Sequence, residues 1–184
     1  FNFDNPVQPN TRVHATLANQ LGLFVTMYSP LQMACDLPEN YMKRPAEFQF
    51  IRDVPCDWEQ SRLLSGEIGK YVVMARQDRR SADWYIGAVN DDTPRDITLD
   101  WSFLFDENVG TSSSDRDTAH TDKAYTAHTG RAYTAQIYRD APDADWQTNP
   151  YATVIEEQQI TSASAPLTIS LASGGGFAIR LIAR

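Results

Sequence analysis

The sequence predicts a mixed fold, in which a helix-rich N-terminal piece is followed by an antiparallel β-sandwich. Before residue 53, apolar residues recur at helical spacing. After residue 66 they alternate with polar residues or form short runs separated by Gly, Pro, Asn and Asp. The change falls at Val54-Pro55, because the residue before a proline is displaced from the helical region. We therefore expect two domains, residues 1–55 and 56–184.

The N-terminal piece reads as helix, strand, loop and helix. The apolar spacing predicts a first helix over about 12–28, ended by Ser29-Pro30. The short run Leu31–Cys35 has the composition of a buried parallel strand, and Pro45 suits the first turn of a second helix. This order is typical of one and a half units of a βα barrel or of a doubly wound sheet. Since one strand cannot form a sheet, we expect this piece to complete a structure outside the chain.

The C-terminal piece reads as a succession of short strands. Leu167, Ile169 and Leu171 alternate with polar residues, which is the pattern of a half-buried strand. The run Gly174–Gly176 supplies the positive φ angles of a tight connection. Antiparallel sandwiches are typically built from about seven such strands. The predicted strands are 71–76, 84–89, 97–101, 133–138, 152–159, 167–171 and 177–182, the first two forming a hairpin.

Composition excludes several classes of partner. The net charge is −8, and acidic and basic residues are mixed along the chain, so no basic patch offers itself to nucleic acid or to an anionic membrane. The longest apolar run, residues 21–33, is too short to span a bilayer and contains Pro30. Cys35 and Cys56 match neither a disulfide framework nor a zinc pattern, and we expect both to be buried thiols. The chain begins at Phe1, so we expect a processed protein or a piece of a longer one.

Residues 106–130 interrupt the strands with a segment rich in Ser, Thr, Asp and Ala. The segment ends in a short tandem repeat, and we interpret it as a mobile insertion. His120, Asp122 and His128 could meet at a metal ion, but nothing in the sequence fixes their geometry. We expect solvated loop side chains there, and assign no metal ligand to this chain.

No pair of carboxylates in the sequence is suited to acid–base catalysis. Glu156 and Glu157 are neighbours on a predicted strand, so their side chains point to opposite faces. Asp143 and Asp145 lie in a Pro-Asp-Ala-Asp turn, where aspartate is favoured by bonds to its own backbone. We assign no catalytic residue.

The four tryptophans are the side chains best suited to stack on sugar rings. Trp84 lies in a predicted strand and is expected in the core. Trp58 and Trp146 are expected to pack where loops meet a neighbouring domain. A carbohydrate-binding surface remains an alternative for these side chains.

Asp36 and Glu39 are the candidate substrate-binding residues. If Leu31–Cys35 is a barrel strand, the loop that follows opens on the C-terminal face, where barrel enzymes keep their active sites. The alternative is a loop that caps the next helix.

Several motifs in order resemble the C-terminal third of glycoside hydrolase family 97, a family of bacterial α-glucosidases and α-galactosidases. They are Thr-Leu-Ala-Asn-Gln-Leu (16–21), Tyr-Ser-Pro-Leu-Gln-Met (28–33), Asp-Leu-Pro-Glu-Asn-Tyr (36–41), Asp-Val-Pro-Cys-Asp-Trp-Glu (53–59), Asp-Ala-Pro-Asp-Ala-Asp-Trp-Gln-Thr-Asn-Pro (140–150) and Gly-Gly-Gly (174–176). The resemblance covers nearly the whole chain apart from the insertion at 106–130.

The resemblance implies a parent enzyme with an N-terminal β-sandwich, a catalytic (β/α)8 barrel and a C-terminal antiparallel domain associated with oligomerisation. Residues 1–55 would be helix 7, strand 8 and helix 8 of the barrel. The catalytic glutamates and the calcium ligands of the family would lie upstream, so none is carried onto this chain. The implied substrates are α-glucosides or α-galactosides, and the implied location is periplasmic or extracellular.

We therefore expect a C-terminal part of an α-glycosidase, inactive alone, whose β domain supports the barrel and contributes a homodimer contact. An autonomous carbohydrate-binding module and a pure assembly domain are the alternatives.

Overall fold

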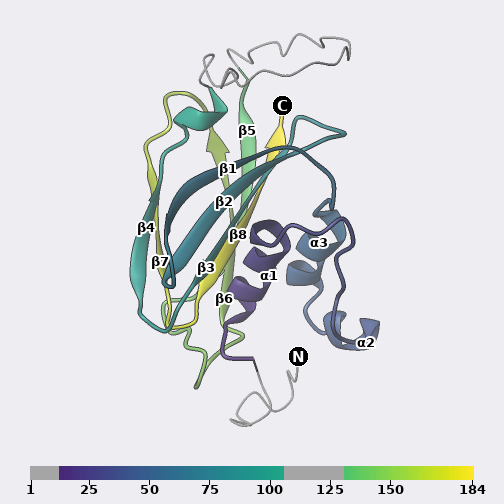
Figure 1. Cartoon of the computed structure of the whole chain (residues 1–184), viewed down its shortest axis with the longest axis vertical. Coiled ribbons are helices and arrows are strands. Elements are labelled where there is room, and N and C mark those ends of the chain that lie inside the picture. The colour runs from purple at the N-terminus through teal and green to yellow at the C-terminus, as the bar shows by residue number, and fades with distance from the viewer. Residues whose placement is uncertain (1–12, 106–130) are drawn as a thin grey trace.

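A six-stranded antiparallel sheet forms the centre of the computed structural model, which describes residues 13–105 and 131–184. The strand order is β1-β2-β3-β8-β5-β6, and β4 and β7 form a second, two-stranded antiparallel sheet. The β4–β7 sheet packs on one face of the large sheet, and helices cover the opposite face (Figure 1). The predicted antiparallel sandwich is confirmed.

The bounds of the elements agree closely with the predicted strands in the C-terminal part of the chain. The predicted hairpin of strands 71–76 and 84–89 is confirmed, because β2 pairs with β3 in antiparallel orientation. The helices are α1 (Leu17–Thr26), α2 (Pro38–Tyr41), α3 (Pro45–Asp53) and the short 3-10 helix η1 (Ser102–Leu104); the strands are β1 (Trp58–Glu67), β2 (Tyr71–Asp78), β3 (Trp84–Asn90), β4 (Arg95–Leu99), β5 (Tyr133–Asp140), β6 (Thr153–Ile160), β7 (Leu167–Leu171) and β8 (Gly176–Ala183).

The large sheet has an apolar core on each face. The inner core joins it to the β4–β7 sheet through residues such as Ile86, Leu99, Ile169 and Phe177. The outer core joins it to the helices, and its members are Leu21, Val25, Phe50, Val54, Trp58, Tyr85, Tyr138 and Ala178. Because this second core draws residues from both sides of position 55, the helices and the sheet pack as one structural unit.

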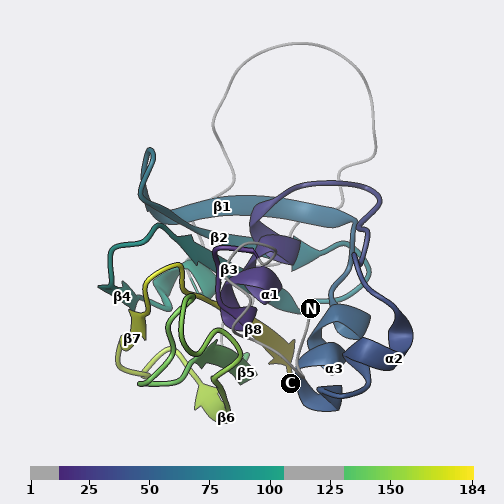
Figure 2. The same cartoon turned by 90° about the horizontal axis from the view of Figure 1, so that it is seen from below.

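Helix α1 crosses β3 and β8 at very close range (Figure 2). Glycines make this possible, because a Cβ atom on Gly22 would stand 2.4 Å from the Ala88 carbonyl oxygen, and one on Gly87 would stand 2.4 Å from the Gly22 carbonyl oxygen. Asn19 adds a buried hydrogen bond from its side-chain amide to the Gly175 carbonyl oxygen, at 2.8 Å. The helix is therefore fixed to the sheet by backbone contact as well as by its apolar face.

The first helix is shorter than predicted. It begins at Leu17, where the Thr16 hydroxyl accepts a hydrogen bond from the Asn19 amide. The residues before it are extended, because the Thr16 amide donates to the Gly174 carbonyl and the Leu17 amide to the Pro150 carbonyl. His14, expected in the first turn, instead lies ahead of the helix with its ring 4.2 Å from that of Trp146.

The predicted strand over Leu31–Cys35 is wrong. These residues are neither helix nor strand, and Leu31 and Met33 are 71% and 81% exposed. They belong to neither sheet of the described chain. The second predicted helix is confirmed as α3, and the expected loop at 36–41 contains the single turn α2.

Other expectations fail in smaller ways. Strand β1 was not predicted. It lies at the edge of the sheet and pairs with β2 alone, and its first residues, Trp-Glu-Gln-Ser-Arg, lack apolar alternation. The two cysteines are not buried, since Cys35 is exposed and Cys56 is half-buried. Of the three consecutive glycines, Gly174 has a positive φ, of 62°.

The insertion at 106–130, with His120, Asp122 and His128, lies outside the described residues. Within residues 13–105 and 131–184, no helix is long and apolar enough to cross a membrane.

Candidate functional site

The most distinctive surface of the described chain is apolar and lies between α1 and α2. Six large apolar side chains there are more than half exposed: Met27, Tyr28, Leu31, Met33, Leu37 and Met42. We call residues 27–42 the apolar loop surface. Scattered exposed apolar residues are ordinary, but a contiguous group of this kind marks an interaction surface.

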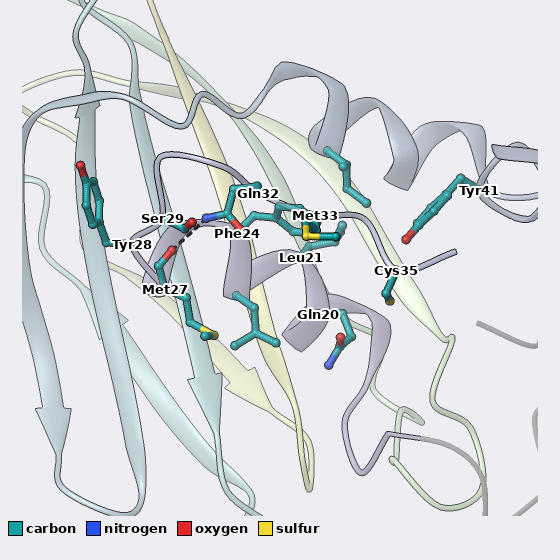
Figure 3. Close-up of a pocket in the computed structure, with 12 residues that line it drawn as sticks. Gln20, Leu21, Phe24, Met27, Tyr28, Ser29, Gln32, Met33, Cys35 and Tyr41 are labelled. Atoms are coloured by element: carbon teal, nitrogen blue, oxygen red, sulfur yellow. Dashed lines mark hydrogen bonds between the residues drawn. The ribbon is translucent and has the colours of Figure 1, made fainter. Parts of the chain in front are cut away.

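A cavity of about 260 Å³ opens under this surface (Figure 3). Leu21 and Phe24 of α1 form its floor, and Met33 lies over them. Tyr41 closes the far side, with its ring stacked on Phe48 at 5.1 Å. Burial raises the pKa of the Tyr41 hydroxyl to about 12, so it stays neutral at physiological pH. The cavity is suited to an apolar side chain of a partner.

The start of the apolar loop surface has a defined conformation. The Ser29 hydroxyl donates to the Leu31 carbonyl oxygen at 2.6 Å, and the Gln32 side-chain amide donates to the Met27 carbonyl oxygen at 3.0 Å. Figure 3 shows the second of these bonds across the turn. Beyond the turn, Leu31 is exposed to solvent, and Met33 lies over the cavity with most of its side chain exposed. A partner would meet a preformed surface there.

Asp36 and Glu39 lie at the end of the apolar loop surface. One carboxylate oxygen of Asp36 accepts from the Leu37 amide and from the Asn40 side-chain amide, both at 2.7 Å. These bonds hold the turn just before α2, whose N-cap residue, Leu37, makes no side-chain cap. Glu39 is exposed in the first turn of α2. The barrel strand on which the substrate-binding prediction depended is absent from this loop, and substrate contact by the two side chains stays a prediction.

The carboxylate pairs have structural partners. Glu156 forms an ion pair with Arg139 at 2.8 Å, and the Asp145 carboxylate accepts from the Gln147 and Thr148 amides at 2.8 and 2.9 Å. The turn interpretation of Asp145 is confirmed. Among residues 13–105 and 131–184, no group of three or more His, Cys, Asp and Glu side chains is placed to hold a metal ion.

Three of the four tryptophans are buried. Trp84 and Trp101 are buried in the inner core, which confirms the prediction for Trp84. Trp58 is buried in the outer core against Tyr85, with ring centroids 5.7 Å apart, so it packs inside the domain. Trp146 is half-buried and contacts His14. Three of the indoles therefore pack inside the domain, and Trp146 is the tryptophan that lies near the surface.

Sequence reasoning missed the exposed side chains of the apolar loop surface, because it assigned Leu31 and Met33 to a buried strand. The available signal was the pair of prolines, Pro30 and Pro38, that bracket the run. Each removes a backbone donor and restricts the residue before it, which favours an isolated extended loop.

The fold and this surface together define an antiparallel β-sandwich domain with an unpartnered apolar surface beside its helices. The chain matches the family model described as "Glycosyl-hydrolase 97 C-terminal, oligomerisation" over residues 57–130 and 109–182. It belongs to this family, so the resemblance seen in the sequence is confirmed.

Relatives support the same assignment. A retaining α-galactosidase from Bacteroides thetaiotaomicron is 31% identical over 179 residues, which are 97% of this chain and 22% of the relative. A glycoside hydrolase family 97 enzyme from Pseudoalteromonas sp. strain K8, solved in complex with panose, superposes with a TM-score of 0.78 and 41% identity. That match covers 94% of this chain and 23% of the enzyme. A β-arabinopyranosidase, at 22% identity and a TM-score of 0.64, shares the fold.

This chain thus spans about a fifth of the length of its curated relative.

Proposed function

We propose that this chain is the C-terminal part of an α-glycosidase that acts on α-glucosides or α-galactosides, and that it supports catalysis carried out elsewhere in the enzyme. Family membership and the retaining α-galactosidase relative support this proposal. The chain corresponds to less than a quarter of each of these relatives. The carboxylates of Glu156 and Asp145 are bonded to an arginine and to backbone amides. The catalytic carboxylates would then be supplied by a barrel upstream of Phe1.

The observation that carries the proposal is the apolar loop surface. Apolar area gains about 25 cal/mol per Å² when it is removed from water, so six exposed apolar side chains favour a permanent partner. The partner we propose is the catalytic barrel of the same polypeptide, reached through α1, α2 and the loop between them. Residues 1–55 would end the barrel region and lie at its junction with the sandwich. This role would account for a preformed surface with no described neighbour.

Three further properties belong to the proposed parent enzyme. Calcium would be bound by carboxylates of the barrel, as the resemblance implies, since the described residues here offer no ligand cluster. The substrate would be an oligosaccharide, with Asp36 and Glu39 as the residues of this chain nearest to the barrel mouth. The enzyme would be periplasmic or extracellular.

Hydrogen exchange tests the proposed role of the apolar loop surface. Amides of residues 27–42 should exchange at least tenfold more slowly in the full-length enzyme than in the isolated chain, because docking on the barrel excludes water. The strands β3 and β8 provide the internal control, since they are buried in both forms. Equal exchange of residues 27–42 in the two forms would overturn the docking role.

A second measurement concerns activity. The isolated chain should show no turnover of aryl α-glucosides or aryl α-galactosides, whereas the full-length enzyme should hydrolyse one of them. Turnover by the purified chain would refute the non-catalytic role.

A further inference from the structure

The hairpin that joins β1 to β2 carries a second apolar surface, far from the first. Its turn runs from Glu67 to Lys70, closed by a hydrogen bond from the Lys70 amide to the Glu67 carbonyl at 2.9 Å. Gly69 adopts the positive φ, 79°, that the turn requires. Ile68 at the tip is fully exposed, and Leu63 on β1 is 65% exposed. The hairpin thus exposes two large apolar side chains close together.

A hollow lies directly beside this tip. It has a volume of about 500 Å³ and is lined by apolar side chains that include Leu63, Val72 and Val89. Tyr71 forms part of its wall and is held in place by Arg95, whose guanidinium carbon stands 4.9 Å from the ring centroid. The hairpin therefore presents an apolar projection and an apolar recess next to each other. We call residues 63–72 with Val89 the hairpin surface.

A projection beside a recess is self-complementary under two-fold symmetry. In a two-fold contact, if one residue of the first copy touches a second residue of the other copy, the reverse contact also forms. Ile68 of each copy would then enter the recess of the other copy. The charges do not oppose this arrangement, because Glu67 and Lys70 flank the tip and form an ion pair with each other at 2.6 Å, so the tip carries no net charge.

The two edge strands offer a poorer contact. Strand β1 has irregular register with β2 at two places, between Trp58 and Gln60 and between Leu63 and Ser65, and such bulges interrupt pairing with a further strand. Strand β6 carries Glu156 and Glu157 at its middle, and like charges would face each other if two copies paired antiparallel there. Association through continuous sheet is disfavoured at both edges.

We propose that a second copy of this chain docks on the hairpin surface, with Ile68 of each copy in the recess of the other. The proposal rests on the family to which the chain belongs, because the description of that family includes oligomerisation and its match covers residues 57–130 and 109–182. In the described part of that range, the large apolar side chains classed as exposed are Leu63, Ile68 and Ile155, and the hairpin holds two of them. Figure 2 shows the hairpin at the opposite end of the domain from α2 and α3, so both surfaces can be occupied together.

Sedimentation velocity of the chain over a range of concentrations tests this proposal. The wild-type chain should dimerise, and Ile68→Asp should weaken the dimer by about 30-fold or more, because a charge would enter an apolar recess at the centre of the contact. Ile68→Leu should retain the dimer. Since Ile68 contacts little of its own copy, the melting temperature of the Ile68→Asp monomer should match that of a wild-type sample diluted to monomer.

Two matched variants separate this surface from the others. Met33→Asp tests the apolar loop surface and Ile155→Asp tests the β6 edge, and both should leave the dimer unchanged. A monomeric wild-type chain at all concentrations, or a dimer lost in Met33→Asp or Ile155→Asp but kept in Ile68→Asp, would overturn the proposal. The hydrogen-exchange comparison of residues 27–42 reads the docking role independently, so failure of one proposal leaves the other measurable.

Discussion

The side chain of Arg76 on β2 closes the C-terminal end of helix α1 by donating a hydrogen bond from Nε to the Val25 carbonyl oxygen, at 2.6 Å. The same guanidinium donates to the Thr26 carbonyl oxygen at 3.3 Å and to the Ser61 hydroxyl at 2.6 Å. Carbonyls at the end of a helix have no partner within the helix and carry partial negative charge, so a buried cation is stabilising there. Burial lowers the pKa of Arg76 from its usual value, but the group remains charged. Arg76 thus fixes the point where α1 leads into the apolar loop surface.

Arg76→Met should destabilise the chain by about 2–4 kcal/mol, because it keeps the length of the side chain but leaves helix-end carbonyls unsatisfied. Urea unfolding followed by fluorescence measures the change. Arg80→Met is the control, since Arg80 is exposed in the turn after β2. It should change the free energy of unfolding by less than about 1 kcal/mol. Equal effects of the two variants would contradict the capping role.

Gly22→Ala should also destabilise the chain, although alanine is the better helix former by about 1 kcal/mol. The new methyl group would stand 2.4 Å from the Ala88 carbonyl oxygen and 2.8 Å from that of Phe177, so α1 must move off the sheet. We expect a net loss of about 1–3 kcal/mol, measured as a lower melting temperature. Gln20→Ala, in the same helix but on its partly exposed side, should be within about 0.5 kcal/mol of wild type. A stabilised Gly22→Ala variant would show that the helix–sheet distance is not limited by this contact.

The strands of the sandwich follow from the sequence because their burial has period two. Strand β7 shows this plainly, as Ile169 and Leu171 point into the inner core while Thr168 and Ser170 face water. Strand β1 escapes such reasoning, since it lies at the edge of the sheet and several of its polar side chains bond sideways, as Gln60 does to Gln77. Its place is set by pairing with β2, which is a tertiary property.

The site is less accessible to sequence reasoning than the fold. Leu31 and Met33 have the composition of buried residues, and a single sequence cannot tell burial within the domain from burial against another domain. Asp36 precedes the N-cap residue Leu37, and its bonds to the Leu37 amide and the Asn40 side chain depend on the folded turn. The hairpin surface could not be predicted either. Ile68 lies at the tip of the hairpin only because of the register in which β1 pairs with β2.

The link between α3 and the sheet offers a third prediction. Arg180 of β8 donates to the Asp53 carboxylate at 2.7 Å, and the Tyr85 hydroxyl donates to the Asp53 carbonyl at 3.0 Å. Tyr85→Phe should remove one of these bonds at a cost of about 1 kcal/mol, with faster hydrogen exchange in α3. Tyr71→Phe is the comparison, since its hydroxyl bonds to Ser65 far from α3. Exchange in α3 that is unchanged in Tyr85→Phe would show that the outer core alone holds this helix.

Asp140 at the end of β5 gives the stability of the chain a dependence on pH. Its carboxylate is buried and accepts from the Gly176 amide at 2.9 Å and the Ala172 amide at 3.1 Å. Burial raises its pKa above the usual 3.8, although the Thr16 hydroxyl and the two amides partly offset this. The folded state therefore holds the proton more tightly than the unfolded state. Stability from this group is greatest below pH 3.8 and declines as the pH rises through the raised pKa.

Asp140→Asn removes this titration while keeping an oxygen that can accept from both amides. Relative to wild type, the free energy of unfolding of Asp140→Asn should therefore rise from pH 3.5 to 7 and then level off. Urea unfolding at a series of pH values measures the difference directly. Asp143→Asn, at an exposed position in the turn after β5, is the control for the substitution itself. A difference between Asp140→Asn and wild type that is constant with pH would mean that Asp140 titrates alike in the folded and unfolded chains.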